Sequence, residues 1–163
     1  MEDAVAIAAI ITLVLNAIST IVQTLEHYRE RKAQEILILQ NFQNRFDEIH
    51  QEGKEFQDFL TNPNFDLAML QKNDEECYNR LLHWSKSLFW LDFDEWYAGH
   101  IVKCVSRQQR SEWDEIIREK MREPVFRQVW EKLRKDNFRG KKKFNKFIDR
   151  HWLEGKRMAS FHL

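Results

Sequence analysis

The sequence predicts an all-α fold, and three observations support this prediction. Only four glycines and two prolines interrupt 163 residues, and neither residue type occurs before Gly53. Both residue types break helices, so their scarcity favours long ones. Apolar residues recur at spacings of three and four, whereas no useful length of chain alternates with the period of two that a strand requires.

The first predicted element is an uncharged segment from Ala4 to Leu25. As a helix it would extend roughly 33 Å, which is enough to cross a hydrocarbon core about 30 Å thick. We therefore predict a transmembrane helix in residues 1–25. A cleaved signal peptide would begin with basic residues, whereas two acidic residues follow Met1 here. Three Lys and Arg residues follow the segment closely, so the positive-inside rule places the N-terminus outside and residues 26–163 in the cytoplasm.

One side of this helix is polar. At about 100° per residue, Thr12, Asn16, Ser19 and Gln23 fall within about 60° of one another, and we call them the polar face. Most of the remaining surface is aliphatic. Exposing an asparagine to lipid is unfavourable, so the polar face needs a partner. Either it packs on neighbouring helices or it lines a water-filled pore within a ring. Both alternatives require partners in the membrane, and we predict a homo-oligomer.

Residues 26–163 are predicted to form a helical domain with a basic C-terminal part. A heptad stripe begins at Leu39, and such a stripe is typical of a face that packs on another helix. Its members are Leu39, Phe42, Phe46, Ile49, Gly53, Phe56 and Leu60. Further helices are predicted near 66–71, 74–91, 95–105, 109–121, 124–137 and 141–153. Their aromatic residues fit a hydrophobic core better than a base-stacking surface.

Charge is distributed unevenly, although the formal net charge is zero. Residues 132–157 hold eleven Lys and Arg against three acidic residues, and they include the basic patch Lys141, Lys142 and Lys143. This patch is either a solvated surface or a site for anionic lipid headgroups, an acidic surface of another copy, or RNA. No RNA-binding fold signature accompanies it, so direct nucleic-acid binding is left open.

Candidate catalytic residues are few. The histidines lack metal-ligand spacing and no glycine-rich phosphate loop occurs, so we predict neither a metal nor another cofactor. The acidic cluster Asp92–Glu95 is interpreted as an exposed helix end. The pattern Arg-x4-His occurs as Arg157…His162 and as Arg45…His50, no more often than chance predicts. In a helical domain it resembles the pair of HEPN-type ribonucleases, which would act on the RNA 2′-hydroxyl and the scissile phosphate.

The combination of an N-terminal membrane helix, a short helical domain and the pair Arg157…His162 resembles the small transmembrane accessory proteins of type VI-B CRISPR systems. The resemblance implies an oligomeric ring in the bacterial inner membrane with a pore-like centre, in contact with membrane lipid. It also implies that such a protein strengthens antiviral defence by an RNA-guided ribonuclease effector, through membrane depolarisation. The polar face would then line the channel, and the HEPN-like pair need not be a working nuclease.

Three functions are therefore compatible with the sequence. The first is an oligomeric pore in antiviral defence, and the second is a membrane-anchored helical adaptor without a pore. The third is a membrane-tethered ribonuclease, which would make the chain an enzyme and which the chance frequency of Arg-x4-His favours least.

Overall fold

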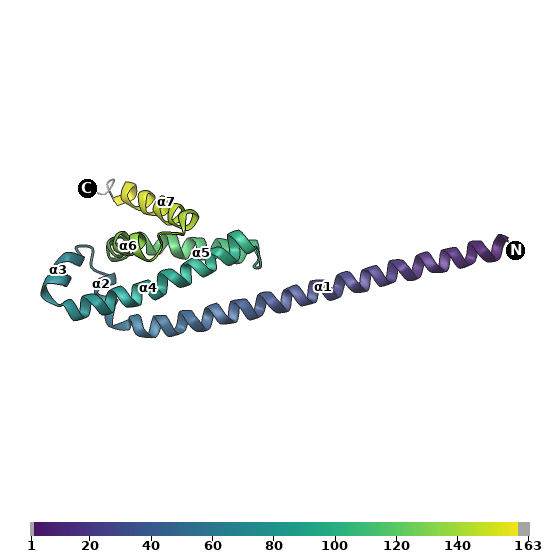
Figure 1. Ribbon diagram of the computed structural model, residues 1–163, viewed down its shortest axis with the longest axis horizontal. Coiled ribbons are helices and arrows are strands. Elements are labelled where there is room, and N and C mark those ends of the chain that lie inside the picture. Colours follow the sequence, from purple (N-terminus) through teal and green to yellow (C-terminus); the bar gives the residue numbers. More distant parts are fainter. Residues whose placement is uncertain (1, 160–163) are drawn as a thin grey trace. The chain divides into compact units, whose positions relative to one another are not determined.

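The computed structural model describes the backbone of residues 2–159 and the side chains of residues 11–151. Within these bounds the chain is helical and contains no strand, which confirms the predicted all-α class (Figure 1). The elements, in chain order, are α1 (Glu2–Glu52), the 3₁₀ turn η1 (Gly53–Phe56), α2 (Gln57–Leu60), α3 (Leu67–Asn73), α4 (Glu75–Tyr97), the π-helical turn η2 (Ala98–Val102), α5 (Arg107–Lys120), α6 (Pro124–Asp136) and α7 (Lys142–Ala159).

The chain divides into two compact units, residues 1–40 and 41–163. In the first unit, every described side chain from 11 to 34 is exposed. None of the helices in the described residues is both long enough and apolar enough to cross a membrane. Residues 4–10, which begin the uncharged segment, lie outside the described side chains. The transmembrane helix stays a prediction.

The second unit packs around α4, which contributes more buried residues than any other described helix. Phe89 of α4 contacts Trp130 and Phe126 of α6, with ring centroids 5.1 and 6.3 Å apart. The Trp130 indole donates a hydrogen bond to Asp149 of α7, at 3.1 Å. Helix α6 therefore contacts both α4 and α7 (Figure 1). Burial confirms the predicted aromatic core at Phe89, Trp96, Trp113, Phe126, Trp130 and Phe144.

Around Gly53, the heptad stripe packs closely against α4. A Cβ at Gly53 would lie 2.4 Å from the Trp84 indole, so no larger residue fits without displacing that ring. The indole Nε1 donates to the Ile49 carbonyl at 2.7 Å, which fixes the ring against the end of α1. Ile49 and Phe56 are buried as predicted, whereas Phe46 is 37% exposed.

The structure joins two helices that the sequence predicted as separate. Instead of ending near 91 and restarting at 95, α4 continues to Tyr97 and passes directly into η2. The acidic cluster Asp92–Glu95 lies within this helix, where Asp92 and Glu95 are buried and Lys120 of α5 pairs with Asp92. The π-helical turn ends at Lys103, whose φ of 58° is left-handed. Downstream, Pro124 opens the first turn of α6, where the missing N–H costs no hydrogen bond.

Candidate functional site

All four residues of the polar face are exposed on α1. Next to them, the Thr20 hydroxyl donates to the Asn16 carbonyl at 2.9 Å, and the Thr24 hydroxyl donates to the Thr20 carbonyl at 2.7 Å. These two hydroxyls are thus satisfied inside the helix, in the way that polar residues are tolerated in membranes. The same stretch exposes the large apolar side chains Ile11, Leu13, Val14, Leu15, Ile18, Ile21, Val22 and Leu25.

The structure does not assemble an Arg-x4-His site among the described residues. Arg157 and His162 lie outside the described side chains. The Arg45 guanidinium donates to Asp94 of α4 at 2.8 Å, whereas the His50 ring stacks on Phe46 with centroids 5.7 Å apart. Five helical positions correspond to about 140° of rotation, so the two side chains leave α1 in different directions.

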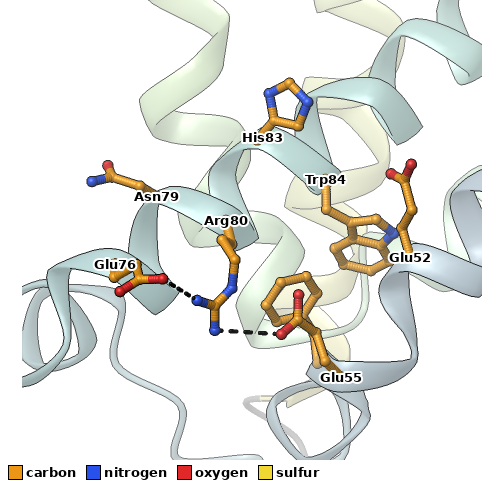
Figure 2. A pocket seen from close by; sticks show the side chains of 8 residues that line it. Glu52, Glu55, Glu76, Asn79, Arg80, His83 and Trp84 are labelled. Atoms are coloured by element: carbon orange, nitrogen blue, oxygen red, sulfur yellow. Dashed lines mark hydrogen bonds and ion pairs between the residues drawn. The ribbon is translucent and has the colours of Figure 1, made fainter.

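A groove that sequence reasoning missed lies between the end of α1 and α4. One cavity of about 430 Å³ is lined by Glu52, Glu55, Phe56, Glu76, Asn79, Arg80, His83 and Trp84 (Figure 2). A neighbouring cavity of about 390 Å³ shares Glu52 and His83 and extends along the same two helices to Arg45 and Trp90. We call the two together the α1–α4 groove. Its floor is aromatic, because Phe56 and Trp84 are buried beneath it.

Ion pairs occupy the rim of the α1–α4 groove. Arg80 lies 2.9 Å from Glu76, one turn earlier on α4, and 3.4 Å from Glu55 of η1. Glu55 and Glu76 raise the pKa of the Arg80 guanidinium further above its usual value, so it stays cationic. Figure 2 shows the His83 ring directed away from these pairs. The groove therefore presents an ion-pair network and an exposed imidazole, and it does not assemble an acid and a base facing one another.

A signal for this groove was present in the sequence. Glu76, Arg80 and His83 follow one another at spacings of four and three, which places them on one side of a helix. Glu55 could not be found in this way, since it comes from η1 and meets Arg80 only through tertiary packing.

The interpretation of the acidic cluster Asp92–Glu95 as an exposed helix end is wrong. Asp92 is 2% exposed and Glu95 is 8% exposed. Lys120 of α5 donates to both carboxylate oxygens of Asp92, at 2.6 and 2.8 Å. Burial raises the pKa of the Asp92 carboxyl, and Lys120 opposes that rise. Burial and, next, the charge of Asp92 raise the pKa of Glu95 to about 8, so a buried carboxyl of α4 holds a proton at neutral pH.

The basic patch borders a second kind of hollow, which we call the lysine pocket. It measures about 330 Å³ and is lined by Phe93, Trp96, Tyr97, Ile101, Gly140, Lys141, Lys142, Lys143 and Phe144. The Lys141 ammonium lies 4.5 Å from the centroid of the Phe93 ring and 5.7 Å from that of Trp90. At these distances the rings attract the cation and hold it at the rim of the pocket.

Among the described residues, no three His, Cys, Asp or Glu side chains gather closely enough to hold a metal ion. No family model, curated protein or solved structure matches this chain.

Proposed function

We propose that this chain is an oligomeric protein of the bacterial inner membrane whose N-terminal helices surround a pore. In this proposal it strengthens antiviral defence by an RNA-guided ribonuclease effector, through membrane depolarisation, and residues 26–163 lie in the cytoplasm. The observation that carries the proposal is the polar face: between residues 11 and 25 of α1, four polar side chains lie exposed on one side of the helix, and the other exposed side chains there are mostly aliphatic.

The chemistry of Asn16 supports an oligomer. The side-chain amide has two donors and an acceptor, and in hydrocarbon these groups are costly unless they find partners. Copies of the helix around a common axis give each Asn16 either another amide or water, while the aliphatic side chains face lipid. Thr20 and Thr24 need no such partner, because their hydroxyls bond to carbonyls one turn earlier.

The resemblance to the small accessory proteins of type VI-B CRISPR systems supports the cellular role. The effector is proposed as a functional partner that acts first, by cutting viral RNA, and this chain as the component that depolarises the membrane. No catalytic step is assigned to the chain, since Arg45 is engaged by Asp94 and points away from His50.

Ion leakage from liposomes tests the pore. The full-length protein is reconstituted, and leakage is compared with that of Asn16→Leu and of a control, Thr24→Val, which loses one polar group away from the polar face. We expect Asn16→Leu to lower leakage about tenfold or more, because a ring of leucines excludes water from the constriction. Thr24→Val should leave leakage within about twofold of wild type. Equal leakage from all three proteins contradicts the lining assignment.

A second candidate, a membrane-anchored adaptor without a pore, is favoured by one observation. The α1–α4 groove and the lysine pocket are hollows of about 330 to 430 Å³ on the second unit, where a partner can dock. The same liposomes separate the two candidates. Inserted, oligomeric protein that conducts no ions, even with the effector and its target RNA present, identifies an adaptor.

A further inference from the structure

The charged residues that line the lysine pocket are all positive, and its interior is apolar. Among the described residues that line it, three are lysines and none is Asp or Glu. The first turn of α7, which forms its edge, also contains no acidic residue. The α1–α4 groove differs, since three glutamates line its larger cavity. The charge of the lysine pocket therefore selects for an anion.

Backbone dipoles add to this charge. Helix α7 starts at Lys142, so its first N–H groups lie at the edge of the pocket together with the three lysines. The N-terminus of a helix carries a partial positive charge that favours phosphate and similar anions. Lys141 is already positioned there by the rings of Phe93 and Trp90. Its ammonium thus loses little conformational freedom when an anion binds.

The interior of the pocket is apolar, so a ligand that fills it also carries an apolar or aromatic group. Tyr97 is 45% exposed and Ile101 is 41% exposed. Together with Phe93 they leave an apolar and aromatic surface beside the cations. A flat ring could stack on this surface, and an alkyl group could also cover it.

We propose that the lysine pocket binds a phosphate ester whose ester group is aromatic or apolar. The phosphate lies between the lysines and the first turn of α7, and the ester group covers Tyr97, Ile101 and Phe93. A volume of about 330 Å³ is at the small end of ligand sites, so the pocket suits a molecule the size of a mononucleotide or a single lipid headgroup. The inference does not depend on the pore, because it concerns a binding site within residues 41–163.

Calorimetric titration of the full-length protein in a maltoside detergent tests the site. Two probes distinguish the sources of the phosphate: adenosine monophosphate represents soluble nucleotides, and dihexanoylphosphatidylglycerol represents lipid headgroups. We expect saturable binding of at least one probe, and binding that weakens as salt is added. Whichever probe binds more tightly identifies the source.

Two variants test the location, and a third controls for charge. Lys142→Gln with Lys143→Gln removes two charges from exposed positions and should weaken binding at least about tenfold. Gly140→Leu places a larger side chain in the lining of the pocket and should weaken binding similarly. It leaves the charge unchanged, and a Cβ at Gly140 meets no atom within 4 Å, so the substitution causes no clash at that atom. Lys132→Gln with Lys135→Gln removes two exposed charges from α6 and should leave affinity within about twofold.

The results are decisive in either direction when circular dichroism shows unchanged helix content in every variant. Binding lost in the α7 double variant and in Gly140→Leu, but kept in the α6 double variant, supports the proposal. Absence of binding by both probes overturns it. Equal weakening by the two double variants also overturns it, since that result would mean that the protein attracts phosphate only through its overall charge.

Discussion

The Glu95 carboxyl makes the stability of the protein depend on pH, which its position in the sequence does not indicate. It is buried on α4, beside the pair that Asp92 makes with Lys120, and its pKa is raised from 4.5 to about 8. A carboxyl whose pKa is higher in the folded state binds more protons when folded than when unfolded. Stability therefore falls as pH rises from about 4.5 to about 8, by at most about 1.4 kcal/mol per pH unit.

We predict that Glu95→Gln flattens this dependence and makes the protein more stable than wild type at pH 8. The amide carries no charge to desolvate and does not repel Asp92. Urea denaturation followed by tryptophan fluorescence, at several pH values from 5 to 8, gives the free energy of unfolding. An unchanged slope in the variant would mean that another group titrates in this range.

Helix packing decides the identity of individual residues in η1 and α4. Gly53 occupies a position of the heptad stripe where a side chain would normally pack, yet a Cβ there would approach the Trp84 indole to 2.4 Å. The indole cannot move away without losing its hydrogen bond to the Ile49 carbonyl. Propensity alone would favour alanine by about 1 kcal/mol in a helix, whereas overpacking costs about 1–3 kcal/mol. At this position the steric effect is expected to dominate.

Gly53→Ala should therefore destabilise the second unit, by as much as about 2 kcal/mol once the gain in helix propensity is subtracted from the steric cost. Gly140→Ala is the matched control, because a Cβ at Gly140 meets no atom within 4 Å, and its stability should stay within about 0.5 kcal/mol of wild type. Both variants are compared with wild type by urea denaturation. If Gly53→Ala proved as stable as the control, the contact between η1 and Trp84 would have to be looser than the structure shows.

At the scale of the whole molecule, the two units differ in what surrounds their apolar residues. Unit 41–163 has a continuous core, in which large side chains such as Phe89, Phe138 and Phe144 are fully buried. Unit 1–40 exposes aliphatic side chains along α1, including Leu13 at 71%. Exposed apolar surface on this scale marks a site of contact with a membrane or with other chains.

We predict that the full-length protein remains in the membrane fraction after extraction with alkaline carbonate, which strips proteins held only by charge. In this prediction the apolar side chains of α1 attach the protein to the membrane, so the same treatment should release a variant in which Val14, Ile18 and Ile21 are replaced by Glu. A neutral control carries Leu at the same three positions and should stay bound. Complete release of wild type would show that the exposed aliphatic side chains of α1 serve protein contacts alone.

The sequence by itself determined the helical class and most of the helix starts. Local rules suffice for these features: few breakers occur, Pro124 suits a first turn, and the Asp74 carboxylate accepts the Cys77 N–H at 2.9 Å to begin α4. It also determined which side of α1 is polar, because that follows from spacing along one helix. Spacing also places Glu76, Arg80 and His83 on one side of a helix, although the α1–α4 groove that they line was not predicted.

Only the tertiary structure decided what covers each face. From the sequence, Asp92 and Glu95 resemble a solvated helix end, whereas in the structure both are buried and Lys120 of α5 pairs with Asp92. Arg80 pairs with Glu55 only because η1 folds back toward α4. The lysine pocket likewise needs α7 to approach the end of α4 and η2. Periodicity shows that one face of a helix is apolar or charged, but the element that packs on that face comes from a distant part of the chain. The packing of that element buries Glu95, which raises its pKa, and it also shapes each pocket.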